Sequence, residues 1–207
     1  DAALTSDPLY VLSNDLTAHI GKRSDELMKA QNDFGASFRL LVEGLRESKI
    51  GTTLYPDANS TLRLTYGKVR SLPADKRNDA VVNNFTTLAG QVKKYKKGDL
   101  EFDLPVRVLE MNAKKEFGRY ADKDGSLHVC FLTDNDITGG NSGSPVLNGK
   151  GELIGLAFDG NIEAMAGDVI FDKNLQRTIN LDIRYVLWII DKYAGAKHIV
   201  DEMSIVK

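Results

Sequence analysis

Gly140-Asn-Ser-Gly-Ser-Pro145 places small residues on both sides of a serine. This arrangement leaves room for a substrate backbone and an oxyanion pocket, so Ser142 is a candidate nucleophile of a serine peptidase. A serine hydroxyl is a weak nucleophile until a base takes its proton, and that base is usually a histidine held by a carboxylate. The same turn can also be a plain hairpin loop, so its surroundings have to decide between the two.

The residues that follow this turn predict a β-hairpin. Residues 145–147 and 153–158 are short apolar runs, and the segment between them contains the turn residues Asn148, Gly149 and Gly151. A serine turn followed by such a hairpin is the order expected in the second β-barrel of a chymotrypsin-like peptidase. The predicted fold class is therefore α+β, with this barrel followed by a C-terminal helix.

Acyl transfer at a serine also needs two preorganised donors for the oxyanion of the tetrahedral intermediate. In a Gly-x-Ser-Gly turn these donors are the backbone N–H groups of the first glycine and of the serine. We therefore assign Gly140 and Ser142 to the oxyanion hole. Gly139 and Gly143 are expected to give the backbone the freedom to point both donors inward.

The general base is not evident in this sequence. It contains three histidines, His19, His128 and His198, and none has a local context typical of a catalytic base. Each is better interpreted as an ordinary surface or core histidine, with His128 the least implausible base because it precedes the serine turn on a predicted strand. A chymotrypsin-like fold places His and Asp in its first barrel, so we expect that barrel to be absent from this chain.

Composition bounds the remaining possibilities. The 207 residues are 42% hydrophobic and carry a formal charge of -2, which is enough for a buried core and gives no electrostatic footprint for nucleic acid. No apolar run is long enough to span a membrane, and the single Cys130 forms no internal disulfide. No metal-ligand spacing is visible, so neither metal nor cofactor is expected. Because the chain begins without Met, we expect it to be a processed or excised piece.

Apolar periodicity predicts helices before the β region. Between residues 9 and 50 apolar residues recur at three- and four-residue steps, which indicates one long or two shorter amphipathic helices. Ser24-Asp25-Glu26 can start or restart a helix, and Gly51 is placed to end one. The predicted domains are residues 1–51, helical, and residues 52–207, which carry the serine.

After residue 51 the pattern changes to short strands. We expect strands over residues 61–66, 106–110, 128–133, 145–147 and 153–158. Residues 75–95 have helical spacing and are interpreted as a helical excursion over the sheet. Residues 182–193 predict a closing helix that Gly195 ends.

Several blocks of this sequence resemble one family more specifically than the serine motif does. They strongly resemble the C-terminal part of the bacterial dipeptidyl-peptidase 7 and dipeptidyl-peptidase 11 family, over residues 55–67, 139–161, 175–179 and 182–187. The family consists of larger periplasmic or cell-surface serine exopeptidases of Gram-negative bacteria. They combine a chymotrypsin-like double barrel with a helical domain that covers the active-site cleft. The resemblance implies that residues 1–51 end that helical cap domain.

The resemblance also implies roles for individual residues. Ser142 would be the nucleophile, while the triad His and Asp would lie in an N-terminal part of the polypeptide that this chain lacks. Asp159 matches an acidic residue that helps to hold the free α-amino group of the substrate, as a carboxylate can. Gly160 matches the position at which relatives that cleave after Asp or Glu carry arginine. The chain therefore resembles the dipeptidyl-peptidase 7 branch, and we expect a preference for an apolar or aromatic penultimate residue.

The expected function is release of dipeptides from oligopeptides with a free N-terminus, with this chain inactive on its own because it lacks the base. Two other functions stay open. A non-catalytic peptide-binding module could keep the peptidase fold without its chemistry. An endopeptidase would need no amine anchor and would accept substrates with an acetylated N-terminus.

Overall fold

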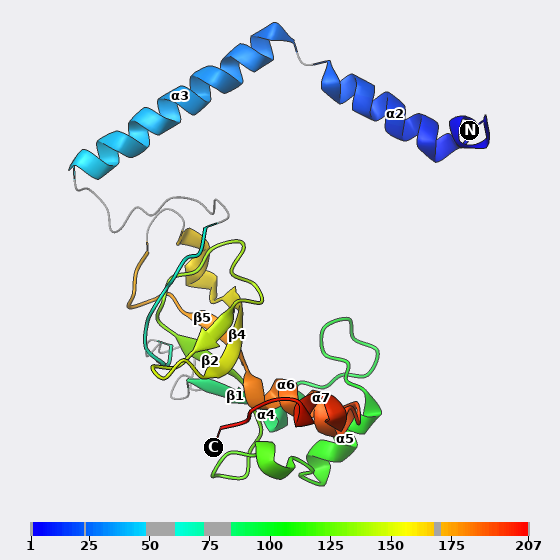
Figure 1. Cartoon of the computed structure of the whole chain (residues 1–207), viewed down its shortest axis with the longest axis vertical. Helices are drawn as coiled ribbons and strands as arrows, with labels where there is room; N and C mark the ends of the chain where they lie inside the picture. The colour runs from blue at the N-terminus through cyan, green and yellow to red at the C-terminus, as the bar shows by residue number, and fades with distance from the viewer. Residues whose placement is uncertain (1, 23, 49–60, 73–83, 168–170, 207) are drawn as a thin grey trace. The chain divides into compact units, whose positions relative to one another are not determined.

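The computed structural model describes residues 2–22, 24–48, 61–72, 84–167 and 171–206. The chain divides into two compact units, Asp1–Pro56 and Asp57–Lys207. The described part of the first unit is helical and the second contains the β-sheet, which confirms the predicted α+β class (Figure 1). The predicted boundary between residues 51 and 52 lies outside the described residues. The assignment of the first segment to a cap domain stays a prediction.

The first unit consists of the short α1 (Ala2–Thr5) and two longer helices, α2 (Pro8–Gly21) and α3 (Asp25–Ser48). Helix α2 starts at a proline, and the Asp7 carboxylate accepts hydrogen bonds from the first free backbone N–H groups. Helix α3 restarts behind Ser24, whose hydroxyl accepts from the Leu27 N–H at 3.1 Å. Two helices separated at Ser24 were among the predictions and are confirmed. The predicted helix end at Gly51 lies outside the described residues.

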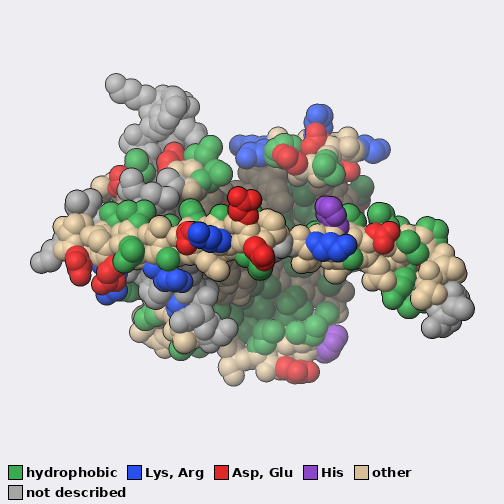
Figure 2. Space-filling view, turned by 90° about the horizontal axis from the view of Figure 1, so that it is seen from above, with side chains coloured by type: hydrophobic (Ala, Val, Ile, Leu, Met, Phe, Trp, Pro, Cys, Tyr) green, Lys and Arg blue, Asp and Glu red, His purple; other side chains and the backbone are tan. Residues whose placement is uncertain are grey.

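The apolar side chains of α2 and α3 remain largely exposed. No described residue of either helix is buried, and Phe34 keeps 71% of its surface accessible. Figure 2 shows hydrophobic side chains interspersed with charged ones along these helices. The first unit therefore has no core of its own within the described residues, and its apolar positions are available for packing against other polypeptide.

The second unit is built on a five-stranded antiparallel sheet with the order β1-β2-β5-β4-β3. Its strands are β1 (Phe85–Thr87), β2 (His128–Thr133), β3 (Pro145–Leu147), β4 (Leu153–Gly160) and β5 (Thr178–Asp182). The sequence predicted β2 and β3 with these bounds, and predicted β4 two residues too short. Strands β1 and β3 are at opposite edges and do not pair with each other, so the described residues form an open sheet rather than a closed barrel.

The sequence analysis missed β5, the central strand of the sheet. Its burial pattern is the reverse of that of a typical strand. The polar residues Thr178, Asn180 and Asp182 are buried, whereas the apolar residues Ile179 and Leu181 are only partly buried. The Asn180 amide donates to the Thr133 hydroxyl at 2.9 Å and lies 3.3 Å from the Phe131 carbonyl, so the buried polar side chain is hydrogen-bonded. Hydrophobic alternation could not identify a strand whose buried face is polar.

Two predicted strands were wrong. Residues 61–66 form no strand, and Leu62, Leu64 and Tyr66 are 100%, 89% and 84% exposed. This segment meets the sheet only farther along, at an isolated bridge between Val69 and Thr133, so its alternating apolar side chains have no sheet face to cover.

Residues 106–110 also form no strand, because they begin α5 (Val106–Ala113). The two β-branched valines suggested a strand, but Val108 and Met111 lie three residues apart on one buried helical face. Packing of that face decides the local structure against the propensity of valine.

The predicted helical excursion over residues 75–95 is partly correct. Residues 75–83 lie outside the described residues, and residues 85–87 form β1 rather than helix. Helix α4 (Leu88–Lys93) follows, with the Thr87 hydroxyl accepting from the Gly90 N–H at 3.2 Å as its N-cap. The cap sets the switch from strand to helix at residue 87.

The hydrophobic core of the second unit lies among its helices, around Trp188. Trp188 is fully buried, packs edge-on against Phe117 and donates from its indole N–H to the Glu116 carbonyl at 2.9 Å. The other buried members of this core are Leu88, Val108, Met111, Tyr120, Leu127, Leu187 and Val200.

The closing helix follows β5 directly. Helix α6 (Ile183–Trp188) continues as a π-helical turn, η4 (Ile189–Tyr193), and the chain reverses at Gly195, whose φ is +71°, before α7 (Lys197–Asp201). The predicted helix over residues 182–193, ended by Gly195, is confirmed. Asp182 is its N-cap, accepting from the Arg184 N–H at 2.9 Å, and also pairs with the Arg184 guanidinium at 2.7 Å.

Because Asp182 both caps α6 and holds Arg184, Asp182→Ala is expected to lower the free energy of unfolding by about 2 kcal/mol. Asp182→Asn should cost less, since its amide oxygen can still accept from the Arg184 N–H. Urea unfolding of this chain, followed by the fluorescence of its single tryptophan, Trp188, would measure both changes. An unchanged midpoint for Asp182→Ala would contradict the assignment.

Candidate active site

The serine turn lies between β2 and β3 and is fastened to β4. The Gly143 N–H donates to the Ala157 carbonyl at 2.7 Å, and the Ala157 N–H donates back to the Ser144 carbonyl at 3.0 Å. These bonds extend the β3–β4 pairing, in which Val146 lies opposite Gly155, up to the turn itself. The position of Ser142 is therefore coupled to a central part of the sheet.

Two glycines of the turn have backbone conformations that favour glycine. Gly140 and Gly143 have φ values of +103° and +85°, in the region that side chains disfavour, although a Cβ at either position would meet no atom within 4 Å. Glycine is therefore needed here for its backbone and not for space. The sequence analysis expected this freedom from Gly139 and Gly143, but Gly140 rather than Gly139 has the positive φ.

Asn141 also shapes the turn. Its side-chain oxygen accepts from the Thr138 N–H at 3.0 Å, while its backbone N–H donates to the Thr138 carbonyl at 3.1 Å. This local side-chain to backbone bond closes the turn before the serine. The sequence analysis gave Asn141 no role, although asparagine before a tight turn is a recognised signal for such a bond.

Ser142 is exposed, and its hydroxyl donates to the Phe158 carbonyl of β4 at 3.3 Å. In the part of the chain that the structure describes, the N–H groups of Gly140 and Ser142 donate to no other group. An oxyanion hole would require both amides to be free to donate to an external acceptor. An exposed serine hydroxyl and two backbone N–H groups without an acceptor among the described residues thus lie at one turn, an arrangement compatible with acyl chemistry.

Asp159 and Gly160 are at the end of β4, next to the residue that Ser142 contacts. Asp159 is exposed, and one of its carboxylate oxygens accepts from the Gly160 N–H at 2.8 Å. Gly160 is half-buried, and a Cβ there would lie only 2.7 Å from the Cβ of Ala164. Ala164 belongs to the 3-10 helix η3 (Ile162–Ala166), so this helix limits the space beside Gly160.

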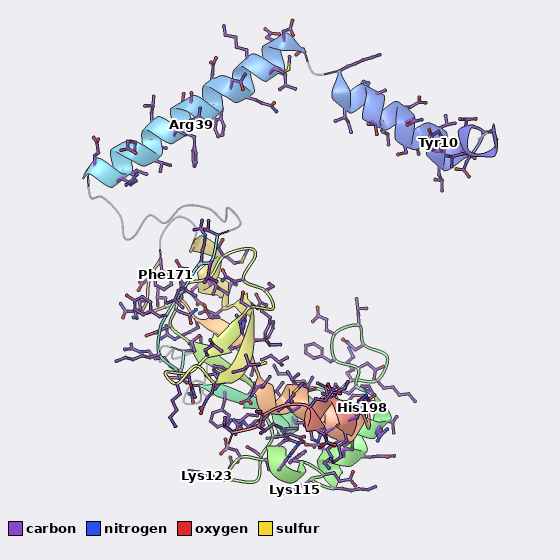
Figure 3. The ribbon with its side chains drawn as sticks, viewed as in Figure 1. Tyr10, Arg39, Lys115, Lys123, Phe171 and His198 are labelled. Carbon is purple, nitrogen blue, oxygen red and sulfur yellow. The ribbon has the colours of Figure 1, made fainter. Side chains whose placement is uncertain are left out.

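Neither His128 nor His198 has a recorded contact with Ser142 among the described residues of the second unit. His19 is on α2, and His198 is on α7, where Figure 3 labels it. The His128 ring stacks on Phe85 with centroids 3.9 Å apart, and its Nδ1 lies 3.2 Å from the Arg184 guanidinium and 3.5 Å from the Asp122 carboxylate. The recorded contacts of His128 are therefore with Phe85, Arg184 and Asp122 and not with the serine turn.

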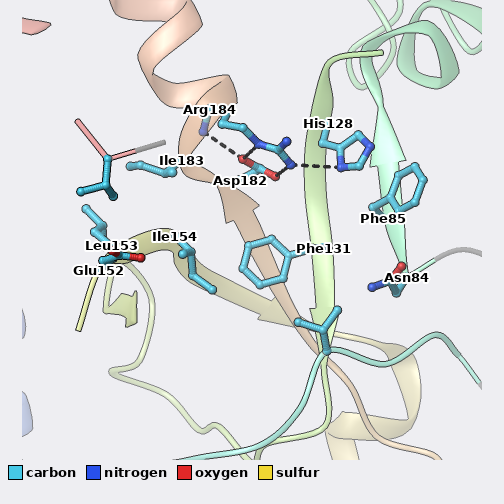
Figure 4. A pocket seen from close by; sticks show the side chains of 12 residues that line it. Asn84, Phe85, His128, Phe131, Glu152, Leu153, Ile154, Asp182, Ile183 and Arg184 are labelled. Carbon is cyan, nitrogen blue, oxygen red and sulfur yellow. Dashed lines mark hydrogen bonds and ion pairs between the residues drawn. The ribbon is translucent and has the colours of Figure 1, made fainter. Parts of the chain in front are cut away.

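His128 and Arg184 line a separate pocket of about 580 Å³ (Figure 4). Arg184 lies between two carboxylates, 2.7 Å from Asp182 and 2.7 Å from Asp122. The hydrogen bond from Arg184 lowers the pKa of the Asp122 carboxyl. The hydrogen bond to Asp182 raises the pKa of the Arg184 guanidinium. Arg184, Asp182 and Asp122 thus pair with one another, which favours a structural role for this cluster.

Within the described ranges no three His, Cys, Asp or Glu side chains gather as metal ligands. No helix there is both long and apolar enough to cross a membrane.

Comparison with known proteins identifies relatives along the whole chain. The family model for peptidase S46 matches residues 1–205. Dipeptidyl-peptidase 7 of Capnocytophaga gingivalis is 63% identical over 99% of the chain, and the Asp/Glu-specific dipeptidyl-peptidase of the same organism is 50% identical over 79%. The chain spans only 28% and 23% of the lengths of these two relatives.

Solved structures agree with this relationship. The crystal structure of Porphyromonas endodontalis DPP11 in complex with the dipeptide Arg-Glu matches 95% of the chain with a TM-score of 0.81 and 38% sequence identity, over 28% of that protein. The family resemblance inferred from the serine turn and its flanking blocks is confirmed. This chain belongs to the peptidase S46 family, which includes dipeptidyl-peptidase 7 and DPP11.

Proposed function

We propose that the polypeptide containing this chain is a serine-type dipeptidyl aminopeptidase, and that this chain is its serine-bearing C-terminal part. The observation that carries the proposal is the juxtaposition of an exposed Ser142 with β4, through the hydroxyl contact to Phe158, immediately before Asp159. Nucleophile and amine anchor are then held by one hairpin. The relatives named dipeptidyl-peptidase support this reading.

In the proposed reaction the Ser142 hydroxyl attacks the carbonyl of the second residue of the substrate. Its proton passes to a histidine in the part of the polypeptide outside this chain, and that base then protonates the leaving amine. The Gly140 and Ser142 N–H groups stabilise the oxyanion of the tetrahedral intermediate. Water then hydrolyses the acyl-enzyme and releases a dipeptide.

Asp159 is proposed to bind the α-ammonium group of the substrate. One carboxylate oxygen is engaged by the Gly160 N–H, and the side chain is exposed at the strand end beside the nucleophile. An ion pair at this place fixes the substrate N-terminus, so the carbonyl that reaches Ser142 is that of the second residue. This ion pair would therefore restrict cleavage to the peptide bond after the second residue, whereas an endopeptidase needs no such anchor.

Gly160 is proposed to leave the pocket for the second residue uncharged, which suits an apolar or aromatic side chain. Support comes from the higher identity to dipeptidyl-peptidase 7 than to the Asp/Glu-specific enzyme of the same organism. The exposed apolar residues Ile162 and Met165 follow Gly160 on η3 and are consistent with such a pocket.

The remaining parts of the proposal concern the whole polypeptide. The open sheet would be the serine-bearing half of a chymotrypsin-like double barrel, and residues 1–51 would end the helical cap. The part outside this chain would be the partner that supplies the triad His and Asp. We propose a location in the periplasm or on the surface of a Gram-negative bacterium, which the family resemblance supports. No cofactor is required by this chemistry.

The full-length protein should release dipeptides from a chromogenic substrate, while the isolated 207-residue chain should be slower by more than about a thousandfold because it lacks the base. Ser142→Ala is the control in both forms. Strong activity of the isolated chain that Ser142→Ala abolishes would mean that the base lies within this chain. Inactivity of the full-length protein, together with peptide binding, would favour the non-catalytic binder.

Asp159→Asn in the full-length protein should lower kcat/KM for a substrate with a free N-terminus by about tenfold to a hundredfold, the worth of a charge-assisted hydrogen bond. It should change the low kcat/KM for the acetylated substrate little. Kinetics on the free and acetylated pair measures this, with Asp124→Asn as the matched exposed carboxylate. Wild-type enzyme that cleaves both substrates equally would contradict the anchor and favour an endopeptidase.

Gly160→Arg should shift the ratio of kcat/KM for Glu over Met at the second position by about tenfold or more toward Glu. Since any Cβ at residue 160 would lie 2.7 Å from the Ala164 methyl, we expect the shift to be clearest in an Ala164→Gly background. Gly160→Ala in the same background controls for bulk alone. An unchanged ratio in a folded double variant would argue against Gly160 as part of the pocket.

A further inference from the structure

The loop between β2 and the serine turn lies outside helices and strands, so no regular pattern of backbone hydrogen bonds positions it. After Thr133 the chain runs through residues 134–138 without helix or strand before reaching the turn. Its position must therefore be set by individual contacts. The most buried of these involves Asp134, a residue that the proposed reaction does not use.

Asp134 is a carboxylate with almost no access to solvent, 1% exposed. One oxygen accepts from the Lys68 N–H at 2.6 Å, and the other pairs with the Arg70 guanidinium at 2.9 Å. The Lys173 ammonium lies 3.9 Å away. All of these partners come from outside the loop, so the buried charge ties the start of the loop to two other segments.

The backbone of the loop follows the same segment. The Asp134 N–H donates to the Lys68 carbonyl at 3.0 Å, and the Thr65 hydroxyl donates to the Asp136 carbonyl at 2.7 Å. From the other side, the Thr178 hydroxyl of β5 donates to the Asn135 carbonyl at 2.8 Å. Residues 134–136 are thus held between residues 65–70 and the central strand.

Gly67 makes this close approach possible. A Cβ at residue 67 would lie 2.5 Å from an Asp134 carboxylate oxygen and 2.6 Å from the Asn135 nitrogen. Contacts this short require the backbone of the loop to move. This steric limit is independent of the ion pair and acts on the same two residues.

The two amides of the proposed oxyanion hole belong to parts of the turn that different contacts hold. The Ser142 side of the turn is fastened to β4 through the Gly143 N–H, whereas Gly140 follows the loop that Asp134 anchors. A small displacement of the loop changes the spacing of the two donors, although both remain present. Such a change affects the oxyanion more than the bound substrate.

We propose, on the basis of the proposed function, that Asp134 is a positioning residue for the oxyanion hole, acting with Arg70 and Gly67 to fix the loop that carries Gly140. An ion pair with an exposed guanidinium, such as that of Arg70, contributes little net stability. Its contribution here is geometric, because it holds an irregular loop at one distance from the sheet. The proposed mechanism thereby gives a part to Arg70 and Gly67, which are far from Ser142 in the sequence.

The test uses the full-length protein with Asp134→Asn and Arg70→Gln. Both should lower kcat for dipeptide release by about tenfold or more with KM changed less than about threefold, as expected for a loss confined to the transition state. Both should also slow the labelling of Ser142 by a fluorophosphonate by a similar factor. Arg70→Lys keeps the charge and should restore most of the activity, and Gly67→Ala should reproduce the loss without removing any charge.

Asp191→Asn is the matched control. Asp191 is also a buried carboxylate, accepting from the Tyr120 hydroxyl at 2.8 Å, but it belongs to the helical core. Its loss should lower the melting temperature and leave kcat within about twofold of the wild type. If Asp134→Asn is unstable, Arg70→Gln decides the matter, since Arg70 is exposed.

Wild-type kcat in folded Asp134→Asn or Arg70→Gln would overturn the proposal, as would an effect on KM alone or an equal loss of kcat in Asp191→Asn. The proposed function fails separately. If the wild-type protein releases no dipeptides but Ser142 still reacts with the fluorophosphonate, the role of Asp134 is tested by comparing the labelling rates of the wild type and the variants. A Ser142 that does not react in the wild type overturns both proposals.

Discussion

The polar face of β5 is the constraint on which the second unit depends. Thr178, Asn180 and Asp182 are buried in the centre of the sheet, so each must find hydrogen-bond partners there. Asn180 bonds to β2, Thr178 bonds to the loop before the serine turn, and Asp182 caps α6. One strand thus positions the sheet, the loop before the serine turn and the closing helix, and a polar side chain without its partner would disturb all three.

The parts of the fold that could be predicted are those that local signals determine. The apolar runs of β2, β3 and β4, the turn residues between the last two, and the cap at Ser24 each act within a few residues. β5 could not be found in this way because its buried residues are polar. Residues 106–110 were assigned wrongly because tertiary packing of Val108 overrode the strand preference of valine.

The residues of the candidate site also form two groups, those that local sequence signals identify and those that only the three-dimensional structure brings together. The candidate nucleophile Ser142, its turn and the residues at the end of β4 lie within residues 140–160, and a sequence motif together with a family resemblance predicted them. The supports of that motif come from residues 65–70 and from β5, which no spacing rule connects to the serine. Contacts over such sequence separations depend on the topology of the sheet, and the sequence alone did not reveal it.

If Gly160 lines the substrate pocket as proposed, the crowding beside it bears on how substrate preference could change during evolution. Some glycine codons become arginine codons by a single base change, so the genetic distance between the two kinds of pocket is short. The physical distance is longer, because the Ala164 methyl stands 2.7 Å from where the first carbon of any new side chain would be. A lineage acquiring a charged pocket would therefore need movement or shortening at residue 164 before the arginine gave any advantage. The order of these two substitutions, more than their number, would decide whether the change could be selected.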